Sequence, residues 1–171
     1  MYTKHNLPKM GFTLIELMTV VIIVSLLAAL GVGYYKKSIE QSYFGEGLST
    51  ANLVAEAVNR AHADALAEGD SELLQPKMDS LDIALSNARS CATASNYCRR
   101  SKYFEISIGT TGITTATRVG GNYVIRVQPH FAEKQQRDKI TCEGTDTGGN
   151  GVTFCQSMGF TSCSGAVCQR Q

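Results

Sequence analysis

The sequence lacks the short motifs that mark common enzyme active sites. It contains no G-x-S-x-G nucleophile elbow, no P-loop and no H-E-x-x-H zinc motif. No asparagine stands in an N-x-S/T glycosylation sequon. We therefore expect a protein that is not an enzyme and needs no cofactor.

The chain also lacks tryptophan and an excess of charge of either sign. Its 16 Lys and Arg residues nearly balance 15 Asp and Glu residues, so bulk charge does not favour nucleic acid or acidic partners. Aromatic residues make up 8% of the 171 residues, and glycine occurs 16 times. This composition indicates one turn-rich globular domain plus an anchor, not a disordered chain.

Cysteine is confined to the last part of the chain and never forms a C-x-x-C pair. The six residues are Cys91, Cys98, Cys142, Cys155, Cys163 and Cys168. An even number within one region predicts three disulfides and an oxidising compartment. Free buried thiols or a metal site are the alternatives. Because His5, His62 and His130 lie far from the cysteines in sequence, zinc is disfavoured.

A long apolar run covers residues 12–32. Its polar interruptions are Thr13, Glu16, Thr19 and Ser25. About 20 apolar residues suffice for a helix to span a bilayer. A cleaved secretory signal is the alternative, but the run continues beyond the small residues at 28–29 that could serve as its cleavage site. We expect a transmembrane helix.

Positive charge alone does not orient this helix. Lys4 and Lys9 precede the run and Lys36 and Lys37 follow it, so the positive-inside count is equal on the two sides. Disulfides require the C-terminal part to lie outside the cytoplasm. We therefore expect the N-terminus inside and the C-terminus outside.

The helical pattern continues past the apolar run. Apolar or small residues recur at spacings of three and four, which predicts one buried stripe: Ile39, Tyr43, Gly47, Ala51, Val54, Val58, Ala61 and Ala65. A helix from Phe12 to Ala67 would be roughly 80 Å long at the usual rise per residue. Gly69 predicts its end, with short helical or irregular turns around Pro76.

The next segments favour strands. Residues 102–108, 112–119 and 122–128 are rich in β-branched and aromatic residues, and 138–144 is a weaker fourth candidate. The Gly120–Gly121 pair suits a hairpin turn. An antiparallel sheet of about four strands needs a partner for its apolar face, and the stripe of the long helix provides it. The predicted fold class is α+β.

The segment "KMGFTLIELMTVV", residues 9–21, resembles the N-terminus of type IV pilins and the related pseudopilins. The shared features are a basic leader, Gly11, Phe12, "TLIE" and an apolar helix joined to a small sheet domain. The resemblance implies that a prepilin peptidase cleaves between Gly11 and Phe12 and that the new amine of Phe12 is methylated. Removing 11 of 171 residues would leave 160 and, by losing two lysines, change the net charge from +1 to −1.

Glu16 is the one charged residue in the apolar run. A carboxylate in hydrocarbon needs a partner, although the helix dipole favours it in the first turn. The resemblance implies that this partner is the positive amine of Phe12 in a neighbouring subunit, which gives Glu16 a role in filament assembly. A carboxylate that snorkels to the interface is the alternative.

The chain departs from the family pattern further along the helix. Many type IV pilins have Gly where this chain has Ser25 and Pro where it has Gly33, and their helix is often unwound between these points. Gly31 and Gly33 each weaken a helix by about 1 kcal/mol relative to Ala. Tyr34 and Tyr35 are expected at the membrane–water boundary.

The cysteine-rich end, "ITCEGTDTGGNGVTFCQSMGF", resembles the C-terminal loop of many type IV pilins. A disulfide closes the last strands there, which implies a Cys142–Cys155 bridge worth roughly 3 kcal/mol. The other cysteines could pair locally, as Cys91–Cys98 and Cys163–Cys168. Six cysteines allow 15 pairings, so the full set stays open.

Two further groups of residues are weak candidates for binding sites. Glu143, Asp146 and Asn150 have the oxygen ligands that calcium prefers, but a solvated turn is the simpler interpretation. The basic stretch "RRSK", residues 99–102, could contact DNA or an anionic surface, and a solvated face is again simpler.

These observations divide the chain into four segments. They are a leader peptide (1–11), a transmembrane and assembly half of the long helix (12–33), an amphipathic half (34–68), and a globular domain with the sheet and the cysteine-rich end (69–171).

The resemblance implies a structural subunit of a type IV pilus that polymerises through its N-terminal helix and serves adhesion or twitching motility. Expected partners are other copies of the chain, the prepilin peptidase, the inner-membrane assembly machinery and minor pilins. The precursor is expected in a bacterial inner membrane and the mature protein in the extracellular pilus. The alternatives are a minor pilin, a type II secretion pseudopilin, or a pilus-tip adhesin or DNA-uptake receptor, so contact with nucleic acid stays open.

Overall fold

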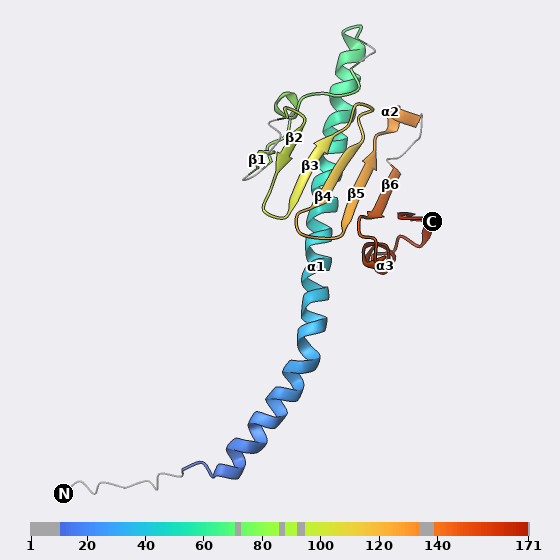
Figure 1. Ribbon diagram of the computed structural model, residues 1–171. Helices are drawn as coiled ribbons and strands as arrows, with labels where there is room; N and C mark the ends of the chain where they lie inside the picture. Colours follow the sequence, from blue (N-terminus) through green and yellow to red (C-terminus); the bar gives the residue numbers. More distant parts are fainter. Residues whose placement is uncertain (1–10, 71–72, 86–87, 92–94, 134–138, 171) are drawn as a thin grey trace, which may run out of the picture. The chain divides into compact units, whose positions relative to one another are not determined.

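The computed structural model describes residues 11–70, 73–85, 88–91, 95–133 and 139–170. Residues 1–10, which include Lys4 and Lys9 of the expected leader, lie outside this part. The chain divides into two units, Met1–Glu40 and Gln41–Gln171. Helix α1, Leu14–Ala67, has residues in both, and the strands all belong to the second unit (Figure 1).

The ends of α1 follow the sequence signals closely. The helix begins at Leu14, two residues after the expected start, and ends at Ala67 as expected. Gly69 has a φ of 90°, and the Asp70 N–H donates to the Ala65 carbonyl at 2.8 Å. This left-handed glycine and the six-to-one hydrogen bond form a Schellman motif, which satisfies carbonyls at the end of the helix.

One antiparallel sheet contains all the strands of the described residues, in the order β1-β2-β3-β4-β5-β6-β8-β7. The four central strands match the four expected ones. The bounds are β1 Arg89–Ser90, β2 Cys98–Arg100, β3 Phe104–Ile108, β4 Thr114–Arg118, β5 Tyr123–Gln128, β6 Lys139–Gly144, β7 Ser162–Ser164 and β8 Val167–Gln169.

The expectation of about four strands was wrong, because the sheet has eight. The four additional strands are only two or three residues long and lie at the two edges. Segments this short show no alternation of apolar and polar residues, so periodicity cannot reveal them. Three of them, β2, β7 and β8, each contain a cysteine that forms a disulfide.

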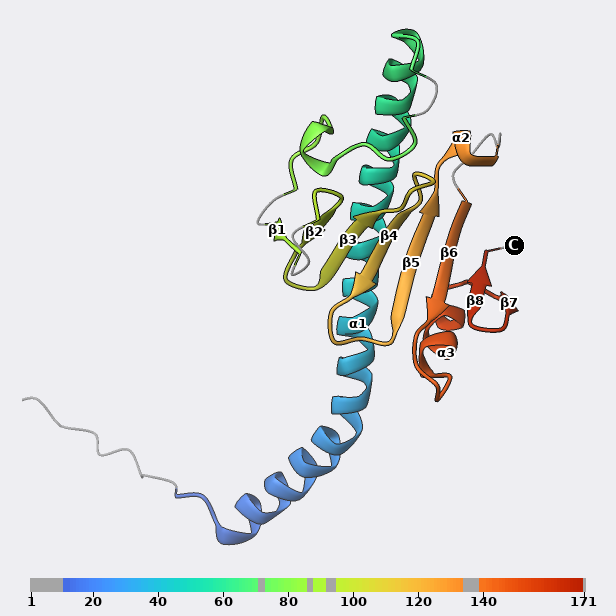
Figure 2. The same cartoon turned by 45° about the horizontal axis from the view of Figure 1, so that its top comes forward.

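The core of the second unit lies between α1 and the sheet, which covers one face of the C-terminal half of α1 in both views (Figures 1 and 2). The helix contributes most of the expected stripe, from Tyr43 onward, together with Phe44, Ala55 and Ala57, which the stripe did not include. The sheet contributes Phe104, Ile106, Ile108, Ala116, Ile125 and Val127, each no more than 2% exposed. This packing confirms the predicted α+β arrangement of helix on sheet.

Gly47 allows α1 to approach the sheet closely. A Cβ atom built at this position would lie 2.5 Å from Cζ of Phe104, whose ring is 1% exposed. Such a distance is far inside van der Waals contact, so any side chain would displace the Phe104 ring from the core. The expected stripe therefore includes a glycine for a packing reason.

A second helix covers the end of the sheet next to β6. Helix α3, Asn150–Ser157, begins inside the glycine-rich segment, where Gly149 has a φ of 74°. It brings Phe154 against Phe44 of α1 and Tyr123 of β5, with ring centroids 5.8 and 4.6 Å apart. The remaining helical elements are α2, His130–Glu133, and a short 3₁₀ helix, Met78–Ser80.

Three disulfides join the cysteines as Cys91–Cys98, Cys142–Cys155 and Cys163–Cys168. These are the three pairs that the sequence suggested. Cys142–Cys155 ties α3 to β6. The register also places Cys168 of β8 directly opposite Cys142 of β6 on one side and Cys163 of β7 on the other. Directly opposite residues of antiparallel strands project from the same face, so three cysteines form a row across the sheet.

Candidate functional site at the start of α1

The backbone before α1 is exposed and not helical. Gly11, Phe12 and Thr13 precede the first helical residue, and Phe12 is 88% exposed. A Cβ atom at Gly11 would contact nothing within 4 Å. The Gly11–Phe12 peptide bond is therefore accessible, as cleavage by a protease requires.

Thr13 and Glu16 bind each other at the first turn of α1. The Thr13 N–H and hydroxyl donate to Oε2 of Glu16 at 2.9 and 2.8 Å, and the Glu16 N–H lies 3.3 Å from the Thr13 hydroxyl oxygen. This reciprocal pairing of the N-cap residue with the third helical residue is a capping box. It satisfies backbone N–H groups that have no carbonyl partner in the first turn of a helix.

The capping role of Thr13 was missed at the level of sequence. The signal was available, because "TLIE" matches the S/T-x-x-E pattern that precedes an apolar helix. The expected partner of Glu16 was a group on a neighbouring subunit, whereas here one of its oxygens is bound within the chain. The other oxygen, Oε1, accepts no hydrogen bond from the described residues.

The apolar half of α1 is exposed on every side. Residues 11–38 are all exposed, and the large apolar side chains from Leu14 to Val32 retain 54–76% of their accessible surface. A helix that is apolar all round needs a membrane or other helices around it. In the described part of the chain, α1 is the one helix long and apolar enough to cross a membrane by length and composition.

The hydroxyl groups of this half are bonded within the helix. Thr19 donates to the Glu16 carbonyl at 3.0 Å, and Ser25 donates to the Val21 carbonyl at 2.7 Å. Such bonds suit an apolar environment, where a hydroxyl without a partner is costly. The Glu16 carboxylate is therefore the group that an apolar environment affects most.

The helix is continuous where the family pattern suggested a possible break. Ser25, Gly31 and Gly33 all lie within α1. Tyr34 and Tyr35 follow and are 79% and 68% exposed. Their rings are free to contact lipid headgroups or another protein.

The candidate calcium ligands already have other partners. Asp146 Oδ2 accepts the Asn150 N–H at 2.9 Å, and Oδ1 accepts the Gly151 N–H at 2.7 Å. These N–H groups, chiefly that of Gly151, lower the pKa of the Asp146 carboxyl below its ordinary value. Glu143 forms an ion pair with Arg126 at 2.8 Å. The segment is thus a capped helix start, in line with the simpler interpretation.

The basic stretch 99–102 does not act as one patch of free charge. Arg99 is paired with Asp79 and donates to the Cys98 carbonyl. Lys102 lies 4.9 Å from the centre of the Tyr103 ring, and a hydrogen bond to the Tyr103 phenol raises the pKa of Lys102. Two of its three cations are therefore engaged, which weakens the interpretation as a DNA contact.

A further cluster, Cys91, Cys98 and Glu105, brings two sulfurs and a carboxylate within 4.8 Å of one another. Both sulfurs belong to one disulfide, so neither is a thiolate that could ligate a metal.

Comparisons with known proteins add no relative: no protein-family model, no curated protein and no solved structure matches the chain.

Proposed function

We propose that this protein is a structural subunit of a type IV pilus with the type IV pilin fold. The precursor sits in the inner membrane with its C-terminal domain outside the cytoplasm. A prepilin peptidase cuts after Gly11, Phe12 is methylated, and the subunit polymerises through α1 into a surface filament.

The observation that carries this proposal is a single carboxylate at the start of the apolar, exposed first half of α1. Thr13 binds one oxygen of Glu16 and leaves the other without a partner among the described residues. An ionised oxygen on an apolar helix favours a neighbour that brings a positive charge. The amine created at Phe12 of an adjacent subunit is such a charge, and neutralising both groups stabilises the packed state over the separate one.

Two further features support an exported filament subunit. The three disulfides suit a protein outside the cytoplasm. The whole buried core lies in the second unit, so the apolar half of α1 is left for packing against other chains.

The decisive experiment is intact, non-reducing mass spectrometry of filaments sheared from the cell surface. The expected dominant species begins at methylated Phe12 and lacks the six hydrogens that three disulfides remove. A processed chain that stays in the membrane fraction would favour a minor pilin or a pseudopilin instead. A chain that retains residues 1–11 would refute cleavage at Gly11.

A further inference from the structure

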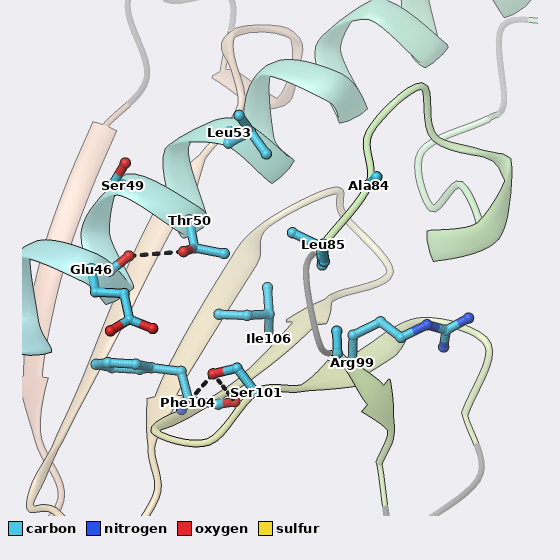
Figure 3. Close-up of a pocket in the computed structure, with 11 residues that line it drawn as sticks. Glu46, Ser49, Thr50, Leu53, Ala84, Leu85, Arg99, Ser101, Phe104 and Ile106 are labelled. Carbon is cyan, nitrogen blue, oxygen red and sulfur yellow. Dashed lines mark hydrogen bonds between the residues drawn. The ribbon is translucent and has the colours of Figure 1, made fainter.

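A pocket of about 290 Å³ opens between α1 and the β2–β3 side of the sheet, within the second unit (Figure 3). One wall comes from α1, the opposite wall from Ala84, Leu85 and Ala88, and the floor from the sheet. Its described lining residues are Glu46, Ser49, Thr50, Leu53, Ala84, Leu85, Ala88, Arg99, Ser101, Phe104 and Ile106.

The apolar part of this pocket is formed by side chains from separate segments. Leu53 extends from α1 and remains 45% exposed, Leu85 lies on the opposite wall, and Ile106 lies on the sheet below them (Figure 3). Exposed leucine beside half-buried leucine gives an apolar surface that an alkyl chain could cover.

Glu46 gives the pocket a negative charge. Its side chain points toward Phe104 at one end of the pocket (Figure 3). No Lys or Arg among the described residues forms an ion pair with Glu46. Two other polar lining groups are occupied: Thr50 donates to the Glu46 carbonyl at 2.8 Å, and the Ser101 hydroxyl bonds with Phe104.

Arg99 does not neutralise Glu46. Its side chain extends away from Glu46 (Figure 3), and its guanidinium group is paired with Asp79. Asp79 lines a neighbouring pocket of about 260 Å³ that shares Leu85 and Arg99 with the first. Among the described residues, the acid of the second pocket therefore has a cationic partner and Glu46 has none.

The size of the Glu46 pocket limits what it can hold. Pockets for drug-sized ligands and cofactors usually measure about 300–1,000 Å³. A volume near the lower limit suits one long side chain. Lysine and arginine combine an alkyl stem, which packs on apolar surface, with a charged head that remains in water.

We propose that this pocket binds a lysine or arginine side chain presented by a partner polypeptide. The stem lies between Leu53 and Leu85 over Ile106, and the charged head pairs with the Glu46 carboxylate. The site lies in the globular unit and is independent of the Glu16 contact, so it concerns recognition of a partner and not polymerisation through α1.

The test is a methyl NMR titration of the full chain in zwitterionic detergent micelles, with labelled leucine and isoleucine. The probes are Nα-acetyl-lysine methylamide, its norleucine analogue, which has a similar alkyl chain without the charge, and the glutamate analogue. We expect the lysine probe to shift the methyl signals of Leu53, Leu85 and Ile106. Glu46→Gln should weaken lysine binding about fivefold, as expected for loss of an exposed charge pair.

The controls separate the charge of Glu46 from general effects. Glu56→Gln makes the same change at an exposed acid on α1 outside the pocket and should leave lysine binding unchanged. Glu46→Gln should leave norleucine binding unchanged. Equal affinity for lysine and norleucine would mean an apolar ligand site and would overturn the proposal. Tighter binding of the glutamate probe, or lysine-induced shifts confined to other residues, would overturn it as well.

Discussion

The two halves of α1 differ in where their apolar surface is buried. From Leu14 to Val32 the large apolar side chains are all more than half exposed, whereas Ala51, Val54, Ala55 and Val58 have no exposed surface at all. The second half uses small residues because it packs on a sheet in its own chain. The first half has large residues and packs on nothing in the described part of its own chain, as the proposed contact with lipid or other chains requires. The comparison teaches that one helix can contribute to the buried core with one half and leave the apolar surface of its other half uncovered by the described part of the chain.

The largest expected effect is loss of filaments in Glu16→Ala with no loss of folding. This change removes the carboxylate and the capping box together, so filaments should fall to a small fraction of the wild-type number. Membrane insertion and thermal unfolding of the second unit should not change. Electron microscopy of surface filaments and membrane fractionation measure the two outcomes.

Two milder variants separate the charge of Glu16 from its part in the capping box. Glu16→Gln keeps a side chain that can serve in a capping box but removes the charge, and Thr13→Ala keeps the charge but removes the cap. If charge pairing drives assembly, Glu16→Gln assembles poorly and Thr13→Ala assembles well. Normal filament number in Glu16→Gln would contradict charge pairing.

Phe104→Ala should destabilise the fold, whereas Glu16→Ala should impair assembly and leave the fold stable. Truncating a ring that is 1% exposed removes about 3–5 kcal/mol from the free energy of unfolding of the second unit. Chemical denaturation followed by near-UV circular dichroism of the tyrosines measures it. Phe12→Ala is the matched control, because Phe12 is 88% exposed and should leave the free energy of unfolding unchanged. A loss in the control would show that the two halves are not independent.

The disulfides should differ in their contribution to stability. Replacing Cys142 and Cys155 by serine opens a loop with a sequence separation of 13 and should cost about 3 kcal/mol, whereas the separation of 5 for Cys163 and Cys168 gives about 2 kcal/mol. Denaturation midpoints of the two double variants give the order. The reverse order would mean that native packing, and not loop length, decides the difference.

Lowering the pH should reduce the free energy of unfolding of the second unit, in part because Asp146 becomes protonated. Its pKa is lower in the folded state than in the unfolded state, so the unfolded state binds more protons as the pH falls. Its stabilisation is present above the ordinary aspartate pKa and is lost as the pH falls through the lower folded value. Asp146→Asn should flatten the fall in unfolding free energy below about pH 4. An unchanged fall in the Asp146→Asn variant would contradict this role of Asp146.

The smallest expected effect is a gain in the free energy of unfolding. The Thr114 hydroxyl is fully buried and has no hydrogen-bond partner among the described residues. Thr114→Val keeps the shape and removes the unsatisfied group, so it should raise the free energy of unfolding by about 1 kcal/mol. Thr117→Val, at an exposed position of the same strand, should produce no comparable gain. A destabilised Thr114→Val variant would imply that the hydroxyl has a partner after all.

Much of the fold could be predicted because its signals are long or chemically distinctive. The stripe of α1 repeats over many turns, Gly69 ends the helix, and the four central strands are five or six residues each. The edge strands could not be predicted, since Arg89–Ser90 or Ser162–Ser164 has no period and pairs only because disulfides and neighbouring strands hold it.

The site was predictable in its residues but not in its contacts. Glu16 stands out in an apolar run, whereas Thr13 resembles any other short polar residue until its spacing to Glu16 is considered. The Glu46 pocket gave no sequence signal, because its lining comes from α1, from Ala84, Leu85 and Ala88, and from the β2–β3 region, which only the tertiary fold brings together.

The row of cysteines across β6, β8 and β7 makes the order of oxidation matter. Cys168 stands opposite both Cys142 and Cys163, and directly opposite residues in antiparallel strands lie within the Cα separation that a disulfide can bridge. If β8 joins the sheet before α3 docks, Cys142 meets Cys168 first and Cys155 is left without its partner. The native pairing is therefore protected if α3 packs on β6 first or if the short Cys163–Cys168 bridge closes first, and otherwise the wrong bridge has to be reopened.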